Sequence, residues 1–228
     1  MDINLHYIEE GTGTPLLLLH GNGEDGTYFK HQLAYFSKKY RVIAVDTRGH
    51  GQSPRGAAPF TISQFAEDLN AFLEQRDISK AVILGFSDGA NIAMRFAMKH
   101  PEKVEALILN GGNLNARGVK ASVQIPIELG YRMTKLFSRI SEKARKNHEM
   151  LALMVDDPNI EPSELKEIHF PTLVIAGTED MIKEEHTKLL AAEIPGAELK
   201  FVKGGHFVAA KASEEFNAAV DLFLERVL

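Results

Sequence analysis

A serine, an acid and a histidine occupy positions in this chain from which their side chains could act together on a substrate. Ser87 stands in the pentapeptide Gly85-Phe86-Ser87-Asp88-Gly89, between the apolar run 81–84 and a helical pattern. Flanking glycines permit the sharp turn that exposes a serine hydroxyl where a strand passes into a helix. The N-terminus of that helix favours a developing negative charge. We therefore predict that Ser87 is a nucleophile.

A serine hydroxyl needs a base, and the base needs a partner that holds it in the correct tautomer. His206 follows two glycines after the apolar run that ends near Val202. Asp180 comes shortly after the run 172–176, with Glu179 beside it as a rival acid. Both segments follow the carboxyl ends of predicted strands, where open α/β sheets place their sites. The chain order of serine, acid and histidine predicts a catalytic triad.

The elements that must position these residues follow from alternating apolar and amphipathic stretches. Short apolar runs predict strands, and helical periodicity predicts the segments between them. Strands that are apolar throughout indicate a parallel sheet covered on both faces. We expect an α/β fold with a doubly wound, mostly parallel sheet, whose first two strands form a hairpin across Gly11-Thr12-Gly13. The expected strands are 3–9, 15–19, 41–45, 81–84, 104–109, 172–176 and 198–202, and the expected helices are 28–39, 62–75, 91–99, 183–194 and 214–227.

One region departs from this alternation. Between residues 113 and 168 helical periodicity continues without a predicted strand, which indicates a small helical cap inserted in a single domain of residues 1–228. Its apolar side chains are expected to pack onto the body of the domain; they include Met133, Leu136, Phe137, Ile140 and Ala144. Eight basic residues stand against three acidic ones from Arg117 to Glu149. This excess favours a solvated helix face over a site for an anionic substrate.

The composition narrows the classes of function. With no cysteine, the chain has neither a thiolate nucleophile nor a cysteine-ligated metal. A net charge of -5 disfavours nucleic-acid binding. No apolar run reaches the ~18 residues of a membrane span, and MDINLHYIEE lacks the features of a signal peptide. We expect a cytoplasmic protein with a small-molecule partner and without a membrane partner, a cofactor or a metal; the oligomeric state stays open.

Five motifs, in order and spread over nearly the whole chain outside the cap, resemble those of the α/β-hydrolase family. They are Leu18-Leu19-His20-Gly21-Asn22-Gly23, Asp46-Thr47-Arg48-Gly49-His50-Gly51-Gln52-Ser53, Gly85 to Gly89, Gly177 to Asp180, and Gly205-His206. The resemblance implies the α/β-hydrolase fold and favours Asp180 over Glu179 as the acid of the triad. It also implies an oxyanion hole formed by the backbone N–H groups of Asn22 and Asp88.

The predicted reaction is hydrolysis of a small carboxylic ester or thioester through an acyl-enzyme on Ser87. Relatives with the same triad hydrolyse carbon–carbon bonds, perform lyase chemistry or only bind a ligand, so these alternatives stay open.

A different alternative is an NAD-dependent enzyme. Gly21, Gly23 and Gly26 follow a predicted strand, and Asp46 lies about 20 residues further on, as in the dinucleotide-binding fingerprint. Against it, the carboxylate of Glu24, like that of its neighbour Asp25, would repel a pyrophosphate in this loop.

Overall fold

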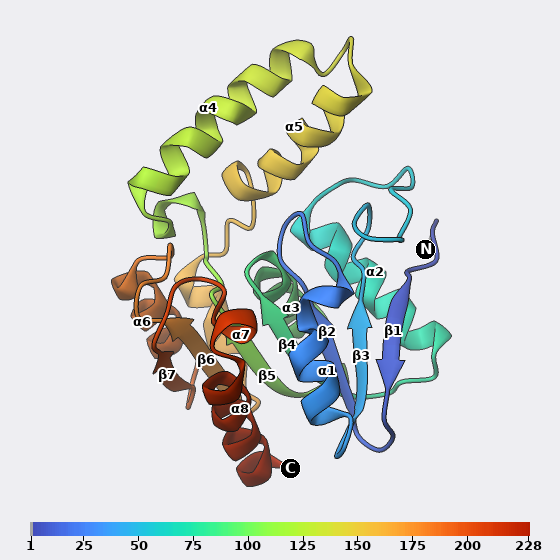
Figure 1. The fold of residues 1–228 in the computed structure, drawn as a ribbon, viewed down its shortest axis with the longest axis vertical. Helices are drawn as coiled ribbons and strands as arrows, with labels where there is room; N and C mark the ends of the chain where they lie inside the picture. The colour runs from blue at the N-terminus through green and yellow to red at the C-terminus, as the bar shows by residue number, and fades with distance from the viewer. Residues whose placement is uncertain (1) are drawn as a thin grey trace.

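Seven strands form one sheet in the computed structural model, which describes residues 2–228 (Figure 1). The strands lie in the order β1-β3-β2-β4-β5-β6-β7, and every neighbouring pair is parallel except β1 with β3. The predicted α/β class with a mostly parallel sheet is confirmed. The strands are β1 (Tyr7–Glu10), β2 (Pro15–Leu19), β3 (Arg41–Val45), β4 (Ala81–Phe86), β5 (Val104–Asn110), β6 (Thr172–Gly177) and β7 (Glu198–Val202).

Helices cover both faces of this sheet because its central strands are apolar on both sides. Along β2, Leu17 and Leu19 face one core with α2, α3 and α6, whereas Leu16 and Leu18 face the other core with α1, α7 and α8. The α-helices are α1 (Lys30–Phe36), α2 (Ile62–Gln75), α3 (Asp88–Lys99), α4 (Ala121–Phe137), α5 (Glu142–Val155), α6 (Glu184–Glu193), α7 (Val208–Lys211) and α8 (Ser213–Val227). Short 3-10 helices are η1 (Gly26–Phe29), η2 (Pro101–Lys103), η3 (Ala116–Gly118) and η4 (Pro162–Glu167).

The expected hairpin between the first two strands is wrong. β1 pairs antiparallel with β3, and β2 lies between β3 and β4. The connection from β1 to β2 crosses the start of β3, where the Arg41 N–H donates to the Thr14 carbonyl at 3.0 Å. Gly11, with φ of 81°, lies so close to the backbone of Ser37 and Tyr40 that a Cβ would collide. Alternation in the sequence predicts a strand but not its partner.

The segment 113–168 contains η3, α4, α5 and η4, and α4 packs on α5 as a hairpin at one end of the molecule (Figure 1). The expectation that its apolar side chains pack onto the body is wrong for Met133, Leu136, Phe137 and Ile140, all of which are exposed. Gln124 is the only buried residue in α4, because this helix contacts mainly its partner in the hairpin. Within residues 2–228, none of the helices has the length and apolarity that a bilayer crossing requires.

Candidate active site

Ser87 lies at the turn between β4 and α3, in a backbone conformation that few residues other than glycine adopt. Its φ and ψ are 54° and -119°. The turn is possible because glycines flank it: a Cβ at Gly85 would collide with the Gly89 carbonyl, and one at Gly89 with the Leu19 carbonyl. Strain of this kind gathers at functional sites. It directs the serine side chain to the carboxyl edge of the sheet.

The structure brings the three predicted triad residues together in one line of hydrogen bonds. Ser87 Oγ lies 3.0 Å from His206 Nε2, and His206 Nδ1 lies 2.7 Å from Asp180 Oδ1. The carboxylate therefore accepts from Nδ1–H and leaves Nε2 free to accept from the serine hydroxyl, which is the tautomer that a general base requires. Glu179, the rival acid, is exposed and makes no side-chain hydrogen bond to His206 within residues 2–228.

Asp180 stays ionised although it is buried. Burial raises its pKa, but the hydrogen bond and charge of His206 and the N–H groups of Ile182 and Gly177 together bring the pKa below its usual range. The Ile182 N–H donates to Oδ1 at 2.9 Å. The loop after β6, which carries Asp180, is also joined to the loop after β7, which carries His206, because the Glu179 N–H donates to the Gly204 carbonyl at 2.8 Å. A charged carboxylate is thus held in place to stabilise an imidazolium.

The predicted oxyanion donors lie beside the serine on two different segments. Asn22 lies in the loop after β2, and Asp88 is the first residue of α3. Within residues 2–228 neither backbone N–H donates to a backbone carbonyl; for Asp88 this is expected of a residue in the first turn of a helix. The Asn22 side chain donates to the Met150 carbonyl at 2.8 Å. Two backbone donors are therefore available beside Ser87, and α5 helps to hold one of them.

His20 positions the loop that carries Asn22. Its Nε2 accepts from the Thr47 N–H at 3.0 Å, so Nδ1 carries the proton and donates to the Gly21 carbonyl at 2.8 Å. Burial lowers the pKa of His20, which keeps the ring neutral. Burial also lowers the pKa of the neighbouring His50, to about 4. His20 thus connects the loop after β2 to the loop after β3, and its ring packs edge-on against that of His50, whose hydrogen bonds stay within the loop after β3.

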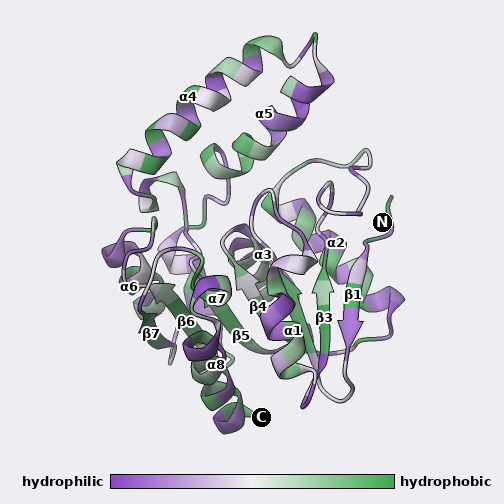
Figure 2. Cartoon of the chain, viewed as in Figure 1, coloured by the Kyte–Doolittle hydropathy of each residue, from purple (hydrophilic) through white to green (hydrophobic). Residues whose placement is uncertain are grey.

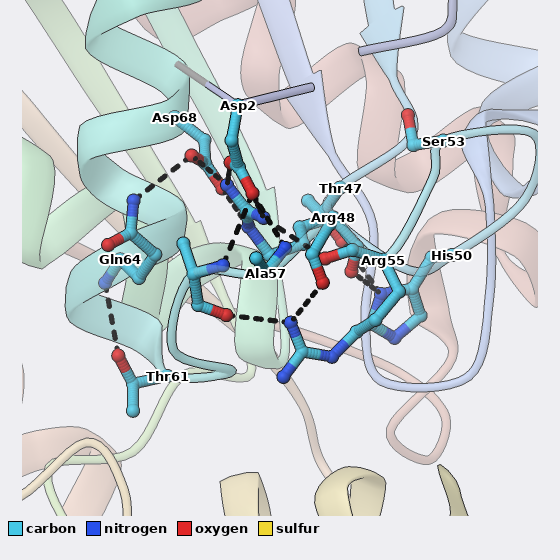
Figure 3. Close-up of polar contacts among 12 residues, drawn as sticks. Asp2, Thr47, Arg48, His50, Ser53, Arg55, Ala57, Thr61, Gln64 and Asp68 are labelled. Carbon is cyan, nitrogen blue, oxygen red and sulfur yellow. Dashed lines mark hydrogen bonds and ion pairs between the residues drawn. The ribbon is translucent and has the colours of Figure 1, made fainter. Parts of the chain in front are cut away.

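Arg48 anchors the loop that follows β3, and its side chain is completely buried (Figure 3). Its guanidinium donates to Asp68 at 2.6 and 2.7 Å and to Asp2 at 2.6 Å. A further bond reaches the Arg55 carbonyl at 3.0 Å. The hydrogen bond with Asp68 is the main cause that raises the pKa of Arg48. Two carboxylates compensate the buried charge, so the loop is fixed against α2.

Asp88 carries a buried carboxyl group at the N-terminus of α3. Its side chain is buried, Oδ2 has no hydrogen-bond partner within residues 2–228, and Asn91 Nδ2 reaches Oδ1 only at 3.5 Å. Burial is the main cause that raises the pKa of Asp88, to about 7. The cost of burying the charge exceeds the gain from the helix dipole. The charge beside the predicted oxyanion hole is thereby reduced at neutral pH.

A pocket of about 180 Å³ opens at Ser87. Apolar side chains make up much of its wall, and Glu24 adds one carboxyl group. Glu24 is about half-buried, its Oε2 has no hydrogen-bond partner in the described chain, and burial raises its pKa to about 7. The lining residues are Gly21, Asn22, Glu24, Phe86, Ser87, Met154, Met181, His206 and Phe207.

The sequence does not reveal the roles of Glu24 and Gly111. The place of Glu24 in the pocket depends on how the loop after β2 folds. Gly111 follows β5 with φ of 62°, and a Cβ there would lie 2.8 Å from His206 Cε1. The glycine pair at 111–112 after an apolar strand was the available signal, because glycine at a strand end often marks a close approach.

The geometry of Asp46 argues against the dinucleotide alternative. Its Oδ1 accepts from the Gly26 N–H at 2.7 Å, and its Oδ2 accepts from the Gln52 N–H at 2.9 Å. His6 Nδ1 lies 2.8 Å from the same Oδ2, and the residue is buried. A carboxylate already bound by three groups of the protein is not free to hold a ribose hydroxyl.

Comparison with known proteins gives a consistent result. The family model of the alpha/beta hydrolase fold matches residues 14–128, a segment that includes Ser87 but neither Asp180 nor His206. An uncharacterised protein of Mycobacterium tuberculosis is 35% identical over 119 residues, which cover 52% of this chain and only 34% of that protein. This match therefore spans about a third of the length of that curated relative.

Two further relatives match along nearly the full chain. The 3-oxoadipate enol-lactonase 2 of Acinetobacter baylyi is 25% identical over 253 residues, with 99% of this chain and 94% of that protein covered. The solved structure of an N-acyl homoserine lactone degrading enzyme superposes with a TM-score of 0.80 at 27% identity and covers 97% of each chain. These similarities extend over the segments that carry Ser87, Asp180 and His206.

Proposed function

The chain belongs to the α/β-hydrolase fold family, and on that premise we propose that it is a serine hydrolase that cleaves a small carboxylic ester or thioester. The observation that carries this proposal is the line from Ser87 Oγ through His206 to Asp180, with distances of 3.0 and 2.7 Å. Hydrogen-bond contact between nucleophile and base, and between base and acid, is the geometry that activates a serine.

In the proposed mechanism, Ser87 Oγ attacks the acyl carbon and His206 Nε2 takes its proton. Asp180 stabilises the imidazolium, and the backbone N–H groups of Asn22 and Asp88 donate to the oxyanion. His206 then protonates the leaving group, whose departure leaves an acyl group on Ser87. Water deprotonated by the same histidine releases the acid. Each oxyanion donor is worth on the order of 3 kcal/mol of barrier.

The pocket supports a substrate of modest size. Its volume of about 180 Å³ is below the roughly 300–1,000 Å³ of pockets that enclose drug-sized ligands. Two full-length matches bear the names of a lactonase and a lactone degrading enzyme, and a lactone is a cyclic ester. A short ester or lactone is the substrate class that we propose first.

The test is turnover of a panel of esters, lactones and thioesters of graded acyl length by wild type and Ser87→Ala. Because only the nucleophile is removed, we expect Ser87→Ala to lose roughly six orders of magnitude in kcat on each substrate that wild type hydrolyses. Ser122→Ala is the matched control, because Ser122 is exposed in α4, and it should retain wild-type rates.

Full activity in Ser87→Ala would refute the proposed nucleophile. Hydrolysis confined to carbon–carbon bonds in a wider panel, with esters untouched, would favour the alternative chemistry of the same triad.

A further inference from the structure

The hairpin of α4 and α5 exposes an apolar surface that no other described element covers. Four side chains of α4 recur at intervals of three or four residues and form one stripe, since that spacing places residues on a single helix face. They are Ile125, Leu129, Met133 and Leu136, with exposed fractions of 64, 62, 49 and 71%, and Ile140, in the turn after the helix, is 81% exposed. We call these residues, with the adjacent Phe137, the α4 stripe.

The α4 stripe is long and continuous. Its helical part, from Ile125 to Leu136, extends about 16 Å, at about 1.5 Å per residue. At its end, Met133, Phe137 and Ile140 border an open hollow of about 500 Å³ between α4 and α5. Half of the large hydrophobic side chains that are exposed within residues 2–228 lie in this stripe. A patch of this kind on a folded chain usually marks a surface of interaction.

Positively charged side chains lie beside the α4 stripe. Arg132 and Lys135 lie on α4, Arg139 lies in the turn after this helix, and Lys143 follows at the start of α5; all four are exposed. None of the four has an ion-pair partner in the part of the chain that the structure describes, whereas Lys146 is paired with Glu142. Unpaired charges of one sign beside an apolar stripe favour a partner that is apolar and negatively charged.

The position of the hairpin allows such a partner to approach. Figure 1 places α4 and α5 at one end of the molecule, opposite the C-terminus, and in Figure 2 hydrophobic and hydrophilic segments alternate along α4. The segment from Arg117 to Glu149 has an excess of five positive charges, although the whole chain has a net charge of -5. The remaining chain is therefore acidic on balance, and a projecting hairpin would hold it away from a negative surface.

We propose that the α4 stripe and its cations form a docking surface for an anionic lipid bilayer. Amphipathic helices with apolar residues on one face and Lys or Arg beside them lie in the headgroup region, and anionic lipids attract the cations. This inference departs from the sequence-based expectation of no membrane partner. It concerns peripheral contact of one helix and no span.

A second copy of the chain fits the same surface less well. An antiparallel pair of α4 helices centred on Met133 would place Arg132 of one copy near Arg132 of the other, and Glu128 would be the only carboxylate of α4 to lie near the cations of the partner copy. Like charges in that arrangement would oppose the gain from covering the stripe.

The test is cosedimentation of the full chain with vesicles of phosphatidylcholine containing about one third phosphatidylglycerol, and with vesicles of phosphatidylcholine alone. We expect binding to the anionic vesicles, about tenfold weaker binding to the neutral ones, and loss of binding as salt screens the charges. The double variant Leu136→Ser/Ile140→Ser should bind anionic vesicles at least about tenfold less, because the buried apolar area is lost. Lys135→Gln/Arg139→Gln should reduce the preference for anionic lipid.

The matched control is Leu222→Ser, since Leu222 is 58% exposed and belongs to α8, which lies at the end of the molecule opposite the hairpin (Figure 1). It should bind as wild type does. Circular dichroism and turnover of a soluble ester should be unchanged in the double variant, which excludes misfolding as the cause of lost binding.

The proposal is overturned if wild type does not sediment with anionic vesicles, or if Leu222→Ser loses binding equally. It is also overturned if light scattering shows a dimer that Leu136→Ser/Ile140→Ser converts to a monomer without any change in vesicle binding. Vesicle binding is independent of ester turnover, so its failure leaves the proposed hydrolase intact.

Discussion

The helices on the sheet and the first helix of the hairpin have the same apolar periodicity and opposite environments. In α2 the side chains of Phe65, Leu69 and Phe72 are buried against the sheet. In α4 the corresponding face, from Ile125 to Leu136, is exposed. Periodicity determines which side chains share a face of a helix, whereas the rest of the fold determines whether anything covers that face. The candidate active site belongs to the region of the sheet and its covering helices, where buried contacts fix the loops.

Among the variants that test this comparison, the largest effect is expected where buried contacts fix the site. Asp180→Asn keeps the shape of the side chain but removes the charge and favours the wrong histidine tautomer, so kcat should fall by roughly 10⁴. Glu179→Gln is the adjacent control, and because Glu179 is exposed it should retain wild-type kcat. The thermal midpoints of both variants should show that the fold persists. Equal losses in the two variants would contradict the assignment of the acid.

Truncation of one leucine in α2 and one in α4 compares how much each helix face contributes to the free energy of unfolding. Leu69 is 1% exposed in α2 and Leu136 is 71% exposed in α4. Leu69→Ala should reduce the free energy of unfolding by about 2–5 kcal/mol, because it leaves a cavity in the core. Leu136→Ala should change it by less than about 0.5 kcal/mol. Urea denaturation of both variants checks this, and a large loss in Leu136→Ala would show that the stripe is covered in solution.

Asp88, which is buried beside the sheet, should make the free energy of unfolding depend on pH. Its pKa rises from the ordinary 3.8 to about 7 on folding, so between these pH values the folded chain holds a proton that the unfolded chain releases. Stability should therefore fall as pH rises from about 4 to about 7 and then level off, by an upper limit of about 4 kcal/mol. Asp88→Asn removes this fall, so at pH 8 it should be about 2–4 kcal/mol more stable than wild type.

Urea denaturation at pH 5 and pH 8 measures this difference, with the exposed Asp77→Asn as control. A gain for Asp88→Asn that is the same at both pH values would exclude titration of Asp88 as its cause.

The smallest effect is expected at Glu24, at the border between the pocket and solvent. Burial raises its pKa to about 7, so the pocket gains a negative charge as pH rises through 7. The ratio of kcat/KM for a cationic ester to that for a neutral ester should then rise by about fivefold, an effect moderated by solvent screening. In Glu24→Gln the ratio should stay constant between pH 6 and pH 8. A rise of the same size in the variant would assign the charge to another group.

The sequence predicted the sheet well because its central strands are apolar on both faces, a pattern typical of parallel sheets. It failed for the partner of β1, since pairing depends on the path that Gly11 takes past the end of α1. For the site, the glycines around Ser87 and the positions of Asp180 and His206 after strands were readable. The contribution of Glu24 was not, because a loop carboxylate has no periodicity that would reveal which way it points.

The central claim is that Ser87 is the activated nucleophile, and a fluorophosphonate adduct mapped by peptide mass spectrometry tests it most directly. We expect a single adduct, on the peptide that contains Ser87, formed at a rate that falls at least about a hundredfold in His206→Ala because the general base is lost. An adduct on a different residue, or labelling of Ser87 at an undiminished rate in His206→Ala, would contradict the account.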